Sequence, residues 1–303
     1  MSTAAQTQSP NCPTVPLSSL DELWFQVAGT RCNLECSHCF ISCSPHNDKF
    51  GYLSLKTVRR YLDESVEQGV REYYFTGGEP FLNKEMVSIL EAALEYGPAT
   101  VLTNATVFKR EWIERLRAAE DASTFCLEFR VSIDGPNSET NDPIRGEGTF
   151  ERAVRGVGML VEEGFLPIIT MTRVWDDGDD QRVLAEFRSI LAEHGYTRPR
   201  LKILPRLKIG AEAERTEGYG QFERITHEMM EDFDVSDLVC NHSRVVTDKG
   251  VAVCPILLDT PAAILSETLA DSKRDFPLAY GACFTCYQFG AICTNPTSKP
   301  MEK

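Results

Sequence analysis

The chain has 303 residues, of which 42% are hydrophobic, and a formal net charge of -14. This negative charge argues against a nucleic-acid partner, because a protein that binds phosphates needs a positively charged surface. No apolar run approaches the roughly 18 residues that cross a bilayer, so we expect no membrane span. Residues 1–19 lack the basic start and apolar centre of a signal peptide, and we interpret them as a flexible tail on a cytoplasmic protein.

The first two thirds of the chain alternate short β-rich segments with amphipathic helical segments. The pattern predicts strands at 23–28, 72–75, 100–103, 128–133, 167–172 and 201–204, and helices at 55–68, 85–96, 110–119, 150–163 and 180–193. Such alternation implies parallel strands joined by right-handed crossovers, in either an open α/β sheet or a barrel. In both folds ligands gather at the carboxyl ends of the strands.

The last third of the chain loses this alternation. We expect a helix at 221–233 and a hairpin of strands 244–247 and 251–253 that turns at Asp248-Lys249-Gly250. The remainder is irregular, and residues 211–303 hold five of the 11 cysteines. A region with little periodicity and many thiols is usually organised by metal. We therefore divide the chain into the tail (1–19), a core (20–210) and a cysteine-rich module (211–303).

A first group of cysteines directly follows the first predicted strand, with the spacing Cys32-x3-Cys36-x2-Cys39. A chain without a secretory signal has reduced thiols, which favours metal binding over disulfides. Zinc would need a fourth ligand, for which His38, Cys43 and His46 are candidates. Three cysteines alone fit an iron–sulfur cubane whose fourth iron is left open. The spacing by itself leaves both metals possible.

Polar residues follow three later strands. Gly77-Gly78-Glu79 combines two residues that allow close backbone approach with a carboxylate that can accept hydrogen bonds from an ammonium group. Asn104 ends the third strand and Ser132 the fourth, and Arg145 lies in the connection after it. Together with the three cysteines, and in this order, these features resemble the radical S-adenosylmethionine (SAM) superfamily.

This resemblance implies a partial (β/α)6 TIM-type barrel and two cofactors. A [4Fe-4S] cluster is expected on Cys32, Cys36 and Cys39, with SAM at its open iron. Gly77, Gly78 and Glu79 would receive the amino group of SAM, and Ser132 and Arg145 its carboxylate. The remaining cofactor-binding candidates are Asn104, His38, which replaces the aromatic residue usual before the third cysteine, and Thr170 beside the adenine.

A second group of cysteines lies in the C-terminal module. Cys240 and Cys254 flank the predicted hairpin, and Cys283-x2-Cys286 follows. Spacing alone allows structural zinc or an iron–sulfur cluster. Behind a radical SAM core the pattern is similar to the twitch module, the short form of the SPASM extension, which implies one auxiliary [4Fe-4S] cluster. Of the remaining cysteines, Cys43 and Cys293 are candidate catalytic hydrogen donors, as in radical epimerases.

The resemblance implies an oxidoreductase or epimerase that reductively cleaves SAM to a 5′-deoxyadenosyl radical and takes hydrogen from a substrate. We expect a small-molecule substrate, because only about twenty residues precede the first strand, and an external electron donor of the flavodoxin or ferredoxin type. One alternative is a SPASM-type maturase of ribosomal peptides. Another is a zinc-organised binding protein without enzymatic activity, which would not explain Gly77-Gly78-Glu79.

Overall fold

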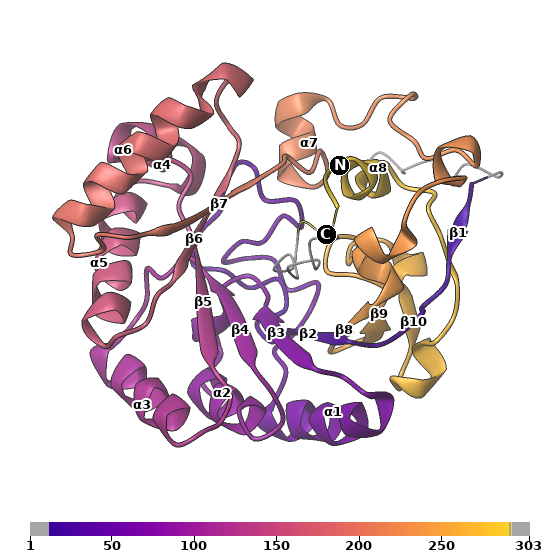
Figure 1. Cartoon of the computed structure of the whole chain (residues 1–303), viewed down its shortest axis with the longest axis horizontal. Coiled ribbons are helices and arrows are strands. Elements are labelled where there is room, and N and C mark those ends of the chain that lie inside the picture. The colour runs from indigo at the N-terminus through magenta and orange to yellow at the C-terminus, as the bar shows by residue number, and fades with distance from the viewer. Residues whose placement is uncertain (1–11, 291, 293–303) are drawn as a thin grey trace, which may run out of the picture.

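The computed structural model describes residues 12–290 and residue 292, and its main feature is a nine-stranded sheet (Figure 1). The strand order is β10-β9-β8-β2-β3-β4-β5-β6-β7, and a two-stranded sheet pairs β1 with β11. The strands are β1 (Thr14–Val15), β2 (Glu22–Gln26), β3 (Glu72–Thr76), β4 (Ala99–Thr103), β5 (Leu127–Ser132), β6 (Ile168–Thr172), β7 (Arg200–Leu204), β8 (Ser243–Thr247), β9 (Gly250–Ala252), β10 (Ile264–Ser266) and β11 (Phe276–Pro277).

Helices α1 (Leu55–Gln68), α2 (Met86–Ala93), α3 (Arg110–Asp121), α5 (Thr149–Glu162) and α6 (Asp180–Glu193) follow parallel strands and cover the outer face of the curved sheet (Figure 1). The other helices are α4 (Ser138–Arg145), which precedes α5, and α7 (Ala211–Thr216) and α8 (Gly281–Phe289), which lie on the side of the C-terminal part. Strands β2 to β7 are all parallel neighbours, and β7 and β10 form the two ends of the sheet. The predicted fold class, a partial (β/α)6 barrel with a cysteine-rich C-terminal part, is confirmed.

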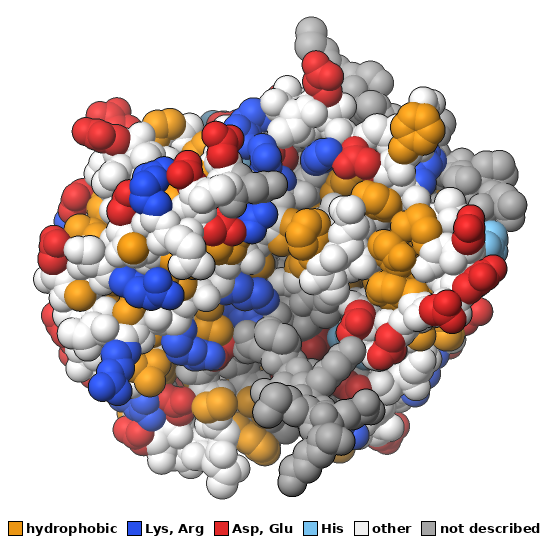
Figure 2. Space-filling view, turned by 45° about the horizontal axis from the view of Figure 1, so that its top comes forward, with side chains coloured by type: hydrophobic (Ala, Val, Ile, Leu, Met, Phe, Trp, Pro, Cys, Tyr) orange, Lys and Arg blue, Asp and Glu red, His pale blue; other side chains and the backbone are white. Residues whose placement is uncertain are grey.

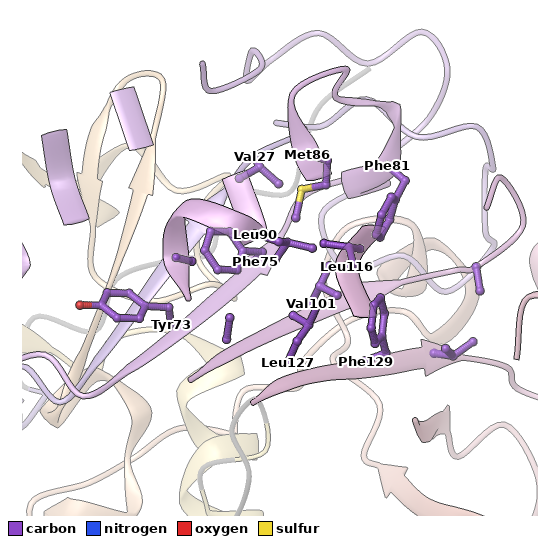
Figure 3. Packing of buried hydrophobic residues seen from close by; sticks show 14 of the residues in the cluster. Val27, Tyr73, Phe75, Phe81, Met86, Leu90, Val101, Leu116, Leu127 and Phe129 are labelled. Atoms are coloured by element: carbon purple, nitrogen blue, oxygen red, sulfur yellow. The ribbon is translucent and has the colours of Figure 1, made fainter. Parts of the chain in front are cut away.

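Successive side chains of the barrel strands point alternately toward the helices and toward the inside of the barrel. Figure 3 shows Phe75 of β3, Val101 of β4 and Phe129 of β5 packed against helix residues such as Leu90 and Leu116. Within each strand, the residues next to these in sequence point to the other face, because successive side chains of a strand alternate. Trp24, Gln26, Arg130, Ser132 and Thr170 on that inner face line a cavity. The helix-facing residues therefore hold the barrel together, and the inner face builds a site.

The C-terminal part of the chain continues the barrel sheet. β8 pairs in parallel with β2, and β9 and β10 extend the sheet by antiparallel pairing. The predicted hairpin is therefore confirmed, with β8 and β9 turning at Asp248-Lys249. The division at residue 210 stays a prediction, because the sheet itself has no break between β2 and β8.

Two local predictions differ from the structure. Residues 221–233 form turns and a short 3-10 helix (Glu228–Met230) in place of the predicted helix. Only Ile225, Met230 and Phe233 of this segment reach the C-terminal core, and Phe222 stays 86% exposed. Residues 12–19 are not a free tail, since β1 pairs with β11 and Val15 is buried.

Helices α4 and α8 were not expected from the sequence, because neither has a regular apolar stripe. Within the described part of the chain, no helix is both long and apolar enough to span a membrane.

Candidate functional site

A cavity of about 220 Å³ opens at the carboxyl ends of the parallel strands. It brings together residues from the loop after β2, the loop after β3 and strands β4 to β6. The predicted cofactor-binding and cluster residues in its lining are Cys32, Cys36, His38, Cys39, Gly77, Gly78, Asn104, Ser132, Arg145 and Thr170. Residues separated by more than 130 positions in sequence thus share one site.

The three thiols of the first cysteine group line this cavity. Backbone N–H groups donate to two of the sulfurs, from Leu34 to Cys32 Sγ at 3.4 Å and from Cys43 to Cys39 Sγ at 3.3 Å. The side-chain amide of Asn104 donates to Cys32 Sγ at 3.8 Å. Hydrogen bonds of this kind stabilise negative charge on sulfur, as a metal-bound thiolate requires.

Burial makes two of these thiols hard to ionise without a cation. It raises the pKa of Cys32 to about 12 and that of Cys36 to about 11. The pKa of Cys39 falls to about 6, because the Cys43 thiol donates a hydrogen bond to its sulfur. Within residues 12–290, no three His, Cys, Asp or Glu side chains converge as ligands of a single metal ion would. Three soft thiols around a cavity are a donor set that fits an iron–sulfur cluster.

The glycine loop after β3 packs against the cysteine loop. A Cβ on Gly78 would lie 1.9 Å from the carbonyl oxygen of Arg31, and one on Gly77 would lie 2.8 Å from the backbone of Ala28. No other residue type fits at either position without moving the loop that carries Cys32. The two glycines therefore set the distance between the thiols and the end of β3.

Glu79 is buried, and its expected contact with the amino group of SAM stays a prediction. Its carboxylate is fully buried beneath the loop and accepts hydrogen bonds from Phe81 N at 3.1 Å, Thr103 Oγ1 at 2.7 Å and Asn104 N at 2.7 Å. Burial raises its pKa to about 7 despite these donors. Glu79 holds the glycine loop and the end of β4 together, and it does not line the cavity as Gly77 and Gly78 do.

Arg145 and His38 meet on one buried carboxylate that the sequence did not single out. Arg145 Nε and His38 Nε2 each lie 2.6 Å from Asp134 Oδ2, and Thr172 N donates to Asp134 Oδ1 at 2.7 Å. Burial alone would raise the pKa of Asp134, but the charge of Arg145 and the His38 ring hold it well below its usual range. The contact uses Nε of Arg145, and a guanidinium has further donors for a second anion. The signal for Asp134 was a charged residue directly after a buried strand.

The four cysteines of the second group also meet in space. Cys240, Cys254, Cys283 and Cys286 line one small cavity whose other walls are apolar, among them Leu238, Val253 and Phe276. Burial raises the pKa of Cys240 to about 12 and moves the pKa of Cys254 and of Cys283 upward. Four thiols around a cavity whose other lining is apolar, and which in the described part of the chain do not converge on a single metal ion, are a donor set that fits an iron–sulfur cluster.

Only one of the two candidate hydrogen donors, Cys43, lies among the described residues. Cys43 lines the main cavity together with the three predicted ligands. Cys293 lies outside the described residues, so its role remains untested. The cavity lining also includes Trp24, Gln26 and Arg130, which were not expected from the sequence. Their signal was a large or polar residue at an inward position of a barrel strand.

Comparison with known proteins gives a family and several relatives. Residues 27–184, just over half of the chain, match the model of the radical SAM superfamily. Over 144 residues the chain is 29% identical to the antilisterial bacteriocin subtilosin biosynthesis protein AlbA of Bacillus subtilis (47% of this chain, 31% of AlbA). It is 35% identical to the AdoMet-dependent heme synthase of Methanosarcina barkeri over 144 residues (47% of this chain, 39% of the synthase). The aligned stretch is thus less than half the length of either relative.

Solved structures agree on the fold. Streptococcus suis SuiB bound to its precursor peptide SuiA superposes with a TM-score of 0.63 at 16% identity, covering 90% of this chain and 71% of SuiB. The enzyme anSMEcpe with bound AdoMet superposes with a TM-score of 0.59 at 15% identity, covering 89% of this chain and 82% of anSMEcpe. With the match over residues 27–184 and the thiols, glycines and arginine around one cavity, the chain belongs to the radical SAM superfamily.

Proposed function

We propose that this protein is a radical SAM enzyme that removes a hydrogen atom from a peptide substrate. The observation that carries the activity is the joint lining of one cavity by Cys32, Cys36 and Cys39, the Gly77-Gly78 loop and Arg145. When bound there, a [4Fe-4S] cluster and SAM supply a single electron and a 5′-deoxyadenosyl radical that abstracts hydrogen.

The residues around the cavity have distinct tasks in this proposal. Cys32, Cys36 and Cys39 hold the cluster, and Gly77 and Gly78 leave room for the amino group of SAM. Arg145, with Ser132 nearby, pairs with the carboxylate of SAM and is kept in place by Asp134. His38 and Thr170 stand at the adenine, as proposed from the sequence. Glu79 acts indirectly, by holding the glycine loop in position.

The cavity also suits an apolar portion of a substrate. Phe40, Leu204, Pro205, Leu207 and Pro255 line it, and apolar walls exclude water from a reactive radical. Among the relatives, AlbA is a bacteriocin biosynthesis protein, MftC is a mycofactocin maturase, and SuiB was solved with a precursor peptide. These names favour a peptide over the small molecule that the sequence suggested.

A small molecule is the second candidate, because a heme synthase is also among the similar proteins. The auxiliary cysteines support a second [4Fe-4S] cluster in both cases. That cluster could accept the electron left on the substrate after hydrogen removal. An external flavodoxin- or ferredoxin-type protein would supply the first electron.

The test is an anaerobic reconstitution with iron and sulfide. About eight irons per chain are expected for two cubane clusters, and dithionite with SAM should then yield 5′-deoxyadenosine. Cys32→Ala should abolish this product, whereas Cys126→Ala, an exposed cysteine outside both groups, should not. Bound zinc without 5′-deoxyadenosine would contradict the proposal.

The substrate class is tested on the same protein. Deuterium transfer from a labelled substrate into 5′-deoxyadenosine identifies the molecule that loses hydrogen. Transfer from a peptide pool, and not from small metabolites, supports the peptide assignment, and the reverse result supports the second candidate.

A further inference from the structure

The loop that carries the first cysteine group holds four thiols, not three. Cys43 follows Cys39 by four positions, is 5% exposed and lines the same cavity as Cys32, Cys36 and Cys39. The proposed function uses only the first three. The fourth thiol therefore needs its own explanation.

The contacts of Cys43 place it between the cysteine loop and the glycine loop. Its thiol lies 3.8 Å from the carbonyl oxygen of Gly77 and donates to the sulfur of Cys39. Its backbone N–H donates to the same sulfur at 3.3 Å. Cys43 thus stands between a proposed cluster ligand and the glycine loop proposed to receive the amino group of SAM. A molecule binding through that group has to enter the space next to this thiol.

We propose that Cys43 is the fourth cluster ligand when SAM is absent, and that SAM displaces it. This inference rests on the proposed function, because it requires a cluster on Cys32, Cys36 and Cys39. Thiolate is a soft ligand that iron–sulfur clusters prefer, and a cubane with three protein ligands has one iron open. The step balances without a redox partner: the thiol proton passes to solvent as the Fe–S bond forms, and the sulfur is protonated again when SAM nitrogen and oxygen take the iron.

The role of Cys43 as a hydrogen donor stays a prediction, and the proposal of a cluster ligand is an alternative to it. A donor that quenches a substrate radical has to touch the substrate. Cys43 instead contacts Cys39 and Gly77, on the thiol side of the cavity. The apolar wall proposed for the substrate comes from other segments, such as Leu204 and Pro255.

The first readout is the stability of the cluster to mild oxidation without SAM. A cubane with an open iron loses that iron and gives the EPR signal of a three-iron cluster, whereas four thiolates protect it. Wild-type protein should give little of this signal. Cys43→Ala and Cys43→Ser should each give at least about fivefold more. The serine variant is the matched control, because its hydroxyl keeps a donor toward Cys39 and Gly77 but is a poor iron ligand.

The second readout is SAM affinity, measured by equilibrium binding to the reconstituted protein. Because ligand and SAM compete for one iron, both Cys43 variants should bind SAM about tenfold more tightly than wild type. Equal three-iron signals, or unchanged SAM affinity in both variants, would overturn the inference. A wild-type protein that forms no 5′-deoxyadenosine would instead count against the proposed function, so the two failures are distinguishable.

Discussion

The two cysteine groups are built on different principles. The first lies on a loop at the mouth of the barrel, beside Arg145, Asp134 and His38, and lines an open cavity of about 220 Å³. The second is drawn from Cys240, Cys254, Cys283 and Cys286 and faces a small cavity with apolar walls. On the face shown in Figure 2, hydrophobic side chains gather to the right, over the C-terminal part, and Lys and Arg side chains are more frequent to the left.

This difference distinguishes a site that can exchange a ligand with solvent from a site that is closed. Charged and polar groups next to three thiols provide contacts for a ligand that enters and leaves. Four thiols in an apolar wall satisfy a metal centre completely and bind segments that have little periodic structure of their own. We therefore expect the first group to serve chemistry and the second primarily to serve folding.

The largest expected effect comes from removing one cysteine from each group in turn and comparing activity and thermal stability. Cys32→Ala should reduce 5′-deoxyadenosine formation by more than about a hundredfold, with Tm within a few degrees of wild type. Cys283→Ala should retain SAM binding but lower Tm by about 10 °C, because the C-terminal segments lose their common anchor. Product assays and thermal unfolding of both reconstituted variants measure this. Equal losses of Tm in the two variants would remove the distinction.

The charged pair at the first site is expected to give the next largest effect. Arg145→Met leaves the buried Asp134 carboxylate without its cation and should lower the free energy of unfolding by about 3–5 kcal/mol. Adding Asp134→Asn should restore most of that stability, because the amide keeps an acceptor for Thr172 N and His38 can change tautomer. SAM binding should stay weak in the double variant. Restored SAM binding would show that Arg145 only neutralises Asp134.

Much of this contrast was predictable from sequence, because it depends on local patterns. Helices α1 and α6 begin and end at the predicted residues, since their apolar spacing matches a buried face. Both cysteine sets were chosen by spacing and proximity to strand ends, and each lines a single cavity.

Tertiary contacts decided the features that were missed. Asp134 gains its importance from Arg145 and His38, which no local pattern connects to it. Helix α8 (Gly281–Phe289) carries Cys283 and Cys286 without an amphipathic repeat. Residues 221–233 have helical spacing, but only three of them reach the C-terminal core. In both segments the surrounding structure overrides local propensity.

The pairing of β2 with β8 joins the barrel to the C-terminal strands, and its contribution to stability should depend on pH. Glu22 on β2 lies opposite Ser243 on β8, and burial raises its pKa to about 7. The native carboxyl therefore keeps its proton to higher pH than the unfolded one, so its contribution is present below about pH 4.5 and is lost as the pH rises to about 7. Glu22→Gln should remove this loss and be more stable than wild type at pH 8, by at most about 3 kcal/mol. Denaturant unfolding at several pH values tests it, with the exposed Glu67→Gln as control.

The smallest expected effect concerns the electronic tuning of the first group. Asn104 donates to Cys32 Sγ, and its backbone N–H donates to Glu79, so it connects the glycine loop to a cluster ligand. A hydrogen bond contributes about 0.5–1 kcal/mol, which corresponds to about 20–40 mV for a one-electron couple. Asn104→Leu should lower the reduction potential of the SAM-binding cluster by that amount, because the donor favours the more negative reduced state.

The control for this shift is Thr106→Val. Thr106 donates to Asn104 Oδ1, so its loss disturbs the same network without removing the donor to sulfur. The cluster in question is recognised in a redox titration as the one whose EPR signal changes on adding SAM. A potential equal to wild type in Asn104→Leu, or an equal shift in Thr106→Val, would show that Asn104 only supports the loop. A shift confined to Asn104→Leu would extend the contrast between the two groups from their shape to their redox chemistry, since the second cavity has apolar walls and offers its sulfurs no such amide side chain among its lining residues.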